Sequence, residues 1–186
     1  MEHYTIKAGY QWLKPDGALV AWYPWMLNEW IIPKQSFCCW LIAHRRLLTL
    51  DRLLKMSIVQ ENVYFLCGLQ EENIEHLFFV CPFSAQCYRL VAEWCKVQLP
   101  MQECISWWLK IRQAAACKKK VLAMILACLM YHLWQCRNCC RLEGYVVRPN
   151  CLVGNVKSDV RMRLAQCDIK SRSNSALAWV EYIRSN

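Results

Sequence analysis

The sequence is poor in the residues that form turns. Only 5 glycines and 6 prolines occur among its 186 residues. A β-sandwich or barrel needs a turn after every short strand, so this scarcity favours a helical fold. It also excludes collagen-like and low-complexity chains. The length suits one domain of ordinary size or two small ones, and it is too short for a complete polymerase.

Residues that would support catalysis are scarce as well. The four aspartates are scattered, whereas polymerase and nuclease chemistry by two metal ions requires clustered carboxylates. The chain has neither a glycine-rich phosphate-binding loop nor a Gly-x-Ser-x-Gly motif. The one acidic cluster consists of Glu71, Glu72 and Glu75, and we expect it to form a polar rim. We therefore predict a protein without enzymatic activity and without a small-molecule substrate.

Signals for secretion and for membrane insertion are also missing from the sequence. Its first residues show no basic segment followed by an apolar one, and no Asn-x-Ser/Thr sequon occurs. We therefore expect a nuclear or cytoplasmic protein whose 14 cysteines are mostly free thiols. The most apolar run, Val121–Trp134, is shorter than the roughly 20 residues of a membrane span and contains His132. It is typical of a central core helix, so membrane binding is not expected.

Positive charge is present in excess and is unevenly distributed. The chain carries 23 lysines and arginines against 14 acidic residues, and residues 101–186 hold 14 of the basic residues and only 5 of the acidic ones. This asymmetry suits a polyanionic partner such as RNA or DNA. The side chains predicted to contact phosphates are Lys118, Lys119, Lys120, Arg137, Arg141, Lys157, Arg161 and Arg163. The alternative for the three consecutive lysines is a solvated helix start.

Apolar residues recur at helical spacing over much of the chain. Pro82 fits the first position of a helix, and the residues that would share its apolar face are Phe83, Cys87, Leu90, Val91 and Trp94. Further helices are predicted at about 103–116, 118–140, 152–166 and 175–184. The expected fold is mainly α, a small multi-helix domain over residues 1–97 followed by a basic helical extension over residues 98–186.

One spacing of cysteine and histidine indicates a metal-binding loop. Cys67, His76 and Cys81 supply two thiolates and an imidazole, which suit tetrahedral zinc. Gly68 would allow the backbone to turn tightly around the ion. Three ligands are fewer than the four of a usual structural site, and His76 could instead be a histidine at the edge of the core. A second cluster of His132 with Cys136 and Cys139 is a weaker alternative, because a continuous helix spreads these groups around its axis.

Five short segments of the sequence occur in an order that is specific to one family. They are Tyr4-Thr5-Ile6-Lys7-Ala8-Gly9-Tyr10, Ile31-Ile32-Pro33-Lys34, Trp40-Leu41, Arg46-Leu47-Leu48-Thr49-Leu50-Asp51-Arg52-Leu53 and His76-Leu77-Phe78-Phe79-Val80-Cys81-Pro82-Phe83-Ser84. With these segments the chain resembles the zinc-binding domain that follows the reverse transcriptase of plant non-LTR retrotransposons. A Tyr-x-Asp-Asp motif of the polymerase itself and any trace of a ribonuclease H domain are absent.

The resemblance implies a non-catalytic zinc-knuckle-like accessory domain, originally attached to a reverse transcriptase, that binds nucleic acid through its basic residues. Its implied zinc ligands are Cys67, His76 and Cys81. The family pattern places a Cys-x-x-Cys before the histidine, and here Tyr64 stands at the first of those cysteines. A phenol is a poor zinc ligand at neutral pH, so water or Cys87 would have to complete the site. The alternative is a decayed retrotransposon fragment, a structural or interaction remnant without zinc.

Overall fold

The computed structural model describes residues 28–68, 70–97, 116–145, 147–169, 171 and 173–186. Over these residues the chain is mainly helical, as predicted, and the described part contains one isolated β-bridge, between Val63 and Glu71, and no β-strand. The elements are α3 (Pro33–Ala43), α4 (Leu50–Lys55), the π-helical turn η1 (His76–Val80), α5 (Pro82–Cys95), α7 (Ala116–Glu143), α8 (Pro149–Ala165) and α9 (Asn174–Ser185). The helix predicted at 103–116 lies almost wholly outside the described residues.

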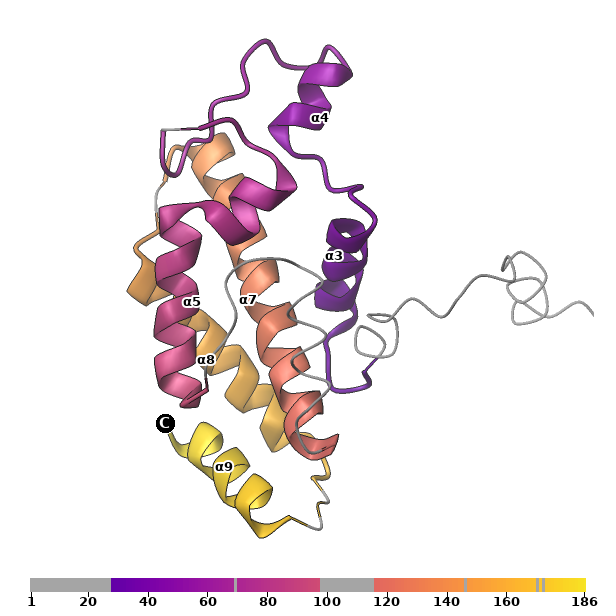
Figure 1. Cartoon of the computed structure of the whole chain (residues 1–186), viewed down its shortest axis with the longest axis vertical. Coiled ribbons are helices and arrows are strands. Elements are labelled where there is room, and N and C mark those ends of the chain that lie inside the picture. The colour runs from indigo at the N-terminus through magenta and orange to yellow at the C-terminus, as the bar shows by residue number, and fades with distance from the viewer. Residues whose placement is uncertain (1–27, 69, 98–115, 146, 170, 172) are drawn as a thin grey trace, which may run out of the picture.

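Helix α7 is the central element of the fold. It packs against α3 and α8, and α5 in turn packs against α8 (Figure 1). Every residue from Val121 to Met130 is buried, which explains why this stretch is apolar all round. No helix among the described residues combines the length and the apolar character that a membrane crossing requires. The predicted central core helix is confirmed.

Helices α5 and α8 pack against each other, and three of the five residues predicted on the apolar face of α5 are buried, while Phe83 and Leu90 are half-buried. Pro82 is the first residue of α5, and Cys87, Val91 and Trp94 are buried along one side of that helix. The buried positions of α8 are Leu152, Val153, Val156, Val160 and Leu164. Helix α8 begins at Pro149, three residues earlier than expected, because this proline occupies the first turn, where a missing N–H costs nothing.

Helix α9 closes the lower end of the structure, and its C-terminus lies near the end of α5 (Figure 1). Ser173 caps its N-terminus by accepting a hydrogen bond from the backbone N–H of Ala176. The indole Nε1 of Trp179 donates to the carbonyl oxygen of Cys95 at 2.7 Å. Arg184 donates to the carbonyl oxygen of Leu164 at 2.9 Å. These bonds satisfy carbonyl groups at the C-terminal ends of α5 and α8.

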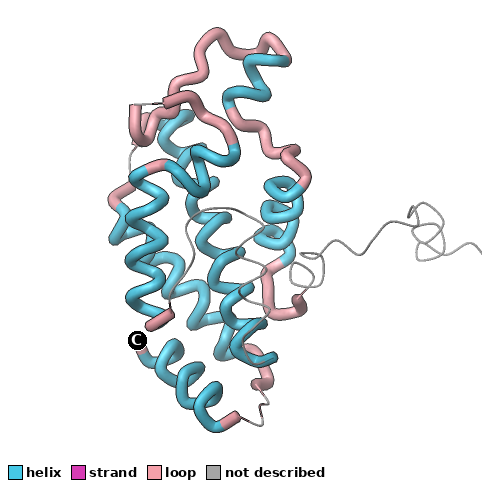
Figure 2. Tube along the Cα trace, in the orientation of Figure 1, coloured by secondary structure: helices cyan, strands magenta, loops and turns pink. Residues whose placement is uncertain are grey.

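Residues from both predicted parts of the chain contribute to one hydrophobic core, which extends in sequence from Trp30 to Ile183. The boundary predicted at residue 97 stays a prediction, since residues 98–115 lie outside the described ranges. At the opposite end of the structure from α9, long loops surround the short helix α4 (Figure 2). Of the candidate metal ligands, Cys67 lies in the segment between α4 and η1, His76 begins η1, and Cys81 follows it.

Candidate metal centre

The first candidate ligand, Cys67, lies in a loop that folds back on itself. The backbone N–H of Tyr64 donates to the carbonyl of Gln70 at 3.0 Å, and the N–H of Glu72 donates to the carbonyl of Asn62 at 2.8 Å. Between these bonds Gly68 adopts a φ of 63°, and its N–H donates to the carbonyl of Tyr64 at 2.8 Å. A left-handed backbone favours glycine at this position, as the sequence predicted. The turn exposes one edge of Cys67 and directs its thiol inward.

The other two candidate ligands, His76 and Cys81, are held at the two ends of one wide helical turn. The backbone N–H of Cys81 donates to the carbonyl of His76 at 2.8 Å, the five-residue bond of a π-helix. The side chain of Asn73 accepts a hydrogen bond from the N–H of His76 at 2.8 Å and so satisfies the start of this turn. Pro82 then begins α5 and prevents η1 from continuing. A π-helical turn at a functional site is a frequent arrangement.

The three candidate ligands, which are separated in the sequence, lie close together in the fold. The Sγ of Cys67 lies 3.2 Å from Nε2 of His76, and the donor atoms of Cys67, His76 and Cys81 all lie within 4.8 Å of one another. Cys81 and His76 are buried, and Cys67 is half-buried. The structure therefore brings together all three ligands predicted from the sequence.

The electrostatics of these donors suit a metal that binds thiolate and neutral imidazole. Burial lowers the pKa of His76, which keeps its ring neutral and its lone pair available. Burial raises the pKa of the Cys81 thiol, and hydrogen bonds from the backbone N–H groups of Ser84 and Phe83 oppose that rise. Such N–H groups at the start of α5 stabilise a thiolate. Two sulfurs and one nitrogen form a donor set that fits zinc.

Tyr64 lies beside the three donors. Its ring meets the ring of His76 edge to face, with the centroids 5.3 Å apart. Burial strongly raises the pKa of the phenol, and the neighbouring Cys81, Glu72, Cys136 and Cys67 raise it further. The phenol is therefore neutral at physiological pH. Its hydroxyl and the Nδ1 of His76 are buried and have no hydrogen-bond partner within the described residues.

Arg137 and Glu72, which were both predicted to lie at the surface, form a buried ion pair next to the loop. Arg137 was predicted to contact phosphate, but it is only 4% exposed and donates to both carboxylate oxygens of Glu72. Glu72 was expected at a polar rim, and its side chain is fully buried. Arg137 projects from α7 toward the loop, where the buried carboxylate requires a cation. The prediction that Arg137 contacts phosphate is therefore wrong, because its side chain is buried in this ion pair.

The other predicted phosphate contacts remain at least partly accessible, and several are held by aromatic rings. Lys118 lies over the ring of Trp179 at 4.9 Å, and Lys157 lies over the ring of Trp94 at 5.6 Å. Both lysines lower the pKa of Cys95 at the end of α5, where they offset part of the rise caused by burial. Sequence reasoning missed a third cation of this group, Lys96, which lies over the ring of Tyr182 at 4.1 Å.

The remaining predicted cations occupy other places on α7 and α8. Lys120 pairs with Glu29 at 2.5 Å, and Arg163 donates to the carbonyl oxygens of Glu29 and Trp30. These two residues connect α7 and α8 to the segment that leads into α3. The half-buried side chains that complete the predicted set are Lys119, Arg141 and Arg161.

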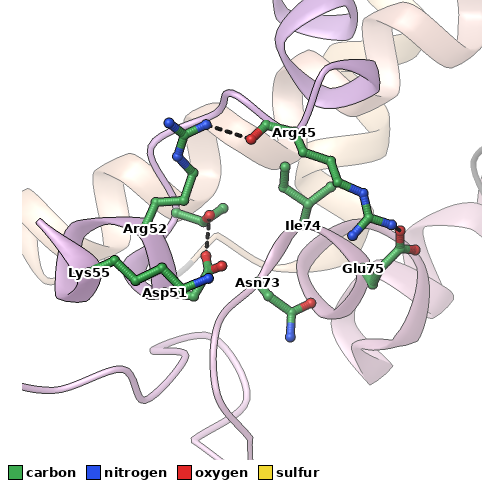
Figure 3. A pocket seen from close by; sticks show the side chains of 8 residues that line it. Arg45, Asp51, Arg52, Lys55, Asn73, Ile74 and Glu75 are labelled. Carbon is green, nitrogen blue, oxygen red and sulfur yellow. Dashed lines mark hydrogen bonds and ion pairs between the residues drawn. The ribbon is translucent and has the colours of Figure 1, made fainter.

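A second basic group, also missed from the sequence, lines an open pocket on the α4 side of the loop (Figure 3). Asp51, Arg52 and Lys55 of α4 lie on one side of it, and Arg45 and Glu75 lie on the other. Arg45 pairs with Glu75 at 3.0 Å, and Arg52 donates to the carbonyl oxygen of Arg45. The carboxylates balance most of the positive charge here, so the pocket is polar rather than strongly cationic.

Comparison with known proteins supports the metal-binding assignment. Residues 4–88, somewhat less than half of the chain, match the family described as zinc-binding in reverse transcriptase. This segment contains Cys67, His76 and Cys81, and the match confirms the resemblance to a zinc-binding domain of reverse transcriptases. Searches of the curated proteins and of the solved structures gave no match. Residues 4–88 are therefore similar to reverse transcriptase zinc-binding domains.

Proposed function

We propose that this protein is a non-catalytic zinc-knuckle-like accessory domain, derived from the reverse transcriptase polyprotein of a plant non-LTR retrotransposon, that binds RNA or DNA. The observation that carries the proposal is the convergence of Cys67, His76 and Cys81 within a segment that matches the zinc-binding family. The free thiols of the thirteen described cysteines suit a nuclear or cytoplasmic protein.

Zinc has a structural task at this site. Cys67 belongs to the loop, while His76 and Cys81 belong to the turn that leads into α5, so an ion held by all three joins the loop to the helical core. Three protein ligands leave one position of a tetrahedron for water. Because the ligands of such a site are ordered mainly by the metal, its binding free energy also stabilises the local fold.

The nucleic-acid surface is a cluster of three lysines and three aromatic rings, which we name the lysine–aromatic cluster. Its members are Lys96, Lys118, Lys157, Trp94, Trp179 and Tyr182. Lysines that contact phosphates give affinity without sequence preference. A base that enters the cluster can stack on a ring and displace a lysine toward a phosphate. Binding is thus electrostatic, and it weakens steeply as the salt concentration rises.

Two measurements on the purified full chain test this function. The first is zinc content per chain for the wild type and for Cys67→Ser, with Cys151→Ser as the control because Cys151 is an exposed thiol of α8. We expect Cys67→Ser to lose one zinc and the control to lose none. The second is binding to single-stranded RNA and DNA oligonucleotides at several salt concentrations. Equal zinc in all three proteins, or no binding at low salt, contradicts the proposal.

A specific observation favours a second candidate function. Tyr64 stands where the family pattern has a cysteine, and its neutral, buried phenol cannot replace a thiolate. A site that has lost one of four ligands suits a decayed fragment that retains its fold as a structural or interaction remnant without zinc. Absence of zinc from the wild type together with zinc in Tyr64→Cys supports this candidate over the first.

A further inference from the structure

A second group of metal-ligating side chains lies between α7 and α8, away from the zinc-knuckle loop. Cys128 and His132 belong to α7, and Asp159 belongs to α8. Their donor atoms all lie within 4.8 Å of one another, and Nε2 of His132 is 2.9 Å from Oδ2 of Asp159. None of these residues falls within the family match at 4–88.

The arrangement follows from helix geometry. Cys128 and His132 are four residues apart, so their side chains are neighbours on one face of α7. The thiol of Cys128 on α7 lies 3.9 Å from the carbonyl oxygen of Val156 on α8, so the two helices are in contact at this level. Asp159 follows Val156 by three residues and so lies on the same side of α8. Both helices supply donors from regular backbone, which holds them in place without a loop.

Solvent exposure increases from Cys128 through His132 to Asp159. Cys128 is 1% exposed, while the side chains of His132 and Asp159 are 14% and 30% exposed. One end of the group therefore faces the core, and the other end faces solvent. A metal ion bound between the three donors would have an open position toward water, as zinc sites with three protein ligands do.

An independent observation on α3 points to the same place. Gln35 is 1% exposed, and its amide Nε2 has no hydrogen-bond partner among the described residues. The amide lies beside the Cys128 sulfur, outside ordinary hydrogen-bond geometry but near enough to lower the pKa of that thiol against the dominant effect of burial. A buried amide without a partner costs free energy. Turned by half a rotation, the same amide presents its oxygen to a cation beside Cys128.

We propose that Cys128, His132 and Asp159 form a second zinc site that fastens α7 to α8. A thiolate and a carboxylate together neutralise a divalent ion, and sulfur, imidazole and carboxylate are all zinc ligands. Bond lengths of about 2.0–2.3 Å place tetrahedral ligands about 3.3–3.8 Å apart, so the donors need to move only slightly. The cysteine proton leaves to solvent when the metal binds. Lys34, an exposed residue of α3, is near enough for its charge to act on Cys128.

The proposed site is structural and independent of the knuckle. It lies in the part of the chain that would form the basic extension, and both of its helices carry residues of the lysine–aromatic cluster, Lys118 on α7 and Lys157 on α8. Metal binding here would hold those two residues in fixed relative positions. The site can exist whether or not the knuckle binds zinc, so the two assignments fail or succeed separately.

The test is zinc content and thermal stability of the full chain after chelation and reconstitution. Asp159→Asn preserves the size of the side chain and a hydrogen bond to His132 but removes a charged ligand, and Cys128→Ala removes the sulfur. Cys95→Ala is the matched control, because Cys95 is another fully buried thiol and belongs to neither group of potential metal ligands among the described residues. Circular dichroism shows whether each variant is folded. Cobalt substitution gives a second readout, since sulfur ligation produces a charge-transfer band.

We expect Asp159→Asn and Cys128→Ala each to hold one zinc fewer than Cys95→Ala and to lose the rise in melting temperature that zinc gives this control. In Cys67→Ser, which disables the knuckle, one zinc should remain, and its cobalt charge-transfer band should disappear when Cys128→Ala is added. Equal zinc content in Asp159→Asn, Cys128→Ala and Cys95→Ala overturns the proposal. So does a Cys67→Ser protein that is folded and binds no metal.

Discussion

Arg137 and Glu72 form a buried ion pair that joins the long helix α7 to the zinc-knuckle loop. Nη2 of Arg137 lies 2.5 Å from Oε1 of Glu72, and Nε lies 3.0 Å from both carboxylate oxygens. The same Oε1 accepts the backbone N–H of Leu50 at 2.8 Å, so Glu72 also caps the first turn of α4. One carboxylate thus connects three segments that are far apart in the sequence.

Breaking this pair should destabilise the fold strongly. Arg137→Met keeps most of the length of the side chain but leaves the Glu72 carboxylate buried without a cation, which costs about 3–5 kcal/mol. Arg45→Met is the control, because its partner Glu75 and the arginine itself are largely exposed. Such an exposed pair contributes less than about 1 kcal/mol. Urea unfolding followed by circular dichroism measures both, and equal losses of stability would contradict the assignment.

The double variant Arg137→Met with Glu72→Gln should be more stable than Arg137→Met alone. Glutamine removes the unpaired charge and can still accept the N–H of Leu50 through its amide oxygen. Additive effects of the two substitutions would show that the charges do not interact.

Introducing a thiol at position 64 should strengthen zinc binding. Tyr64 lies beside the three donors, so Tyr64→Cys should supply a fourth ligand. If a structural zinc site is worth about 10–16 kcal/mol over four ligands, one added ligand raises the affinity by at least about tenfold. Competition with a coloured chelator measures this change. An unchanged affinity in a folded Tyr64→Cys protein would mean that position 64 does not point at the ion.

Removing only the hydroxyl of that residue should leave the fold intact. Tyr64→Phe keeps the ring against His76 and deletes a buried hydroxyl without a partner in the described structure. We expect a free energy of unfolding that is equal to the wild-type value or higher by up to about 1 kcal/mol. A loss of more than about 1 kcal/mol in urea unfolding would show that the hydroxyl makes a bond, for instance through water.

Buried thiols should make the protein sensitive to alkali. Burial raises the pKa of Cys38, Cys87 and Cys95 from 9.0 to about 12. Between these values the unfolded chain has lost the thiol proton and the folded chain keeps it, so the free energy of unfolding falls as the pH rises. Each thiol contributes a slope of up to about 1.4 kcal/mol per pH unit.

A single substitution isolates this contribution from other groups that titrate in alkali. Cys95→Ala should reduce the slope of stability against pH by about one proton between roughly pH 9 and pH 11. Urea unfolding at several pH values gives the slope for both proteins. Parallel slopes for Cys95→Ala and the wild type would indicate that Cys95 is accessible to water in the folded state.

The lysine–aromatic cluster should determine the salt dependence of nucleic-acid binding. Replacing Lys96, Lys118 and Lys157 by glutamine removes three phosphate contacts, so the slope of log affinity against log salt should fall by about three on duplex DNA and somewhat less on single strands. Lys34→Gln is the control, because Lys34 lies on α3 over Tyr131, outside the cluster. Fluorescence anisotropy at several salt concentrations measures the slope. An equal effect of the control would place the binding surface elsewhere.

Much of the fold could be predicted because it follows from local patterns. Pro82 indicates where α5 begins, and the spacing of Cys87, Val91 and Trp94 indicates its buried face. The completely apolar run of α7 indicates a helix that is surrounded by others. The position of α9 could not be predicted, because its contacts reach distant segments: Trp179 donates to a carbonyl group 84 residues away, and Arg184 donates to the carbonyl of Leu164.

The candidate site likewise has a part that the sequence predicts and a part that it does not. The sequence by itself determined the three zinc-knuckle donors, because the types and spacing of Cys67, His76 and Cys81 are local and their motif is shared with a family. Only the tertiary structure decided that Arg137 is buried against Glu72, that Lys96 joins Lys118 and Lys157, and that Asp159 reaches Cys128 and His132. The charge and spacing of residues in the sequence indicate which interactions a residue can make. They do not indicate its partner, which belongs to another segment of the chain. Long-range packing, which a single sequence does not encode locally, selects that partner.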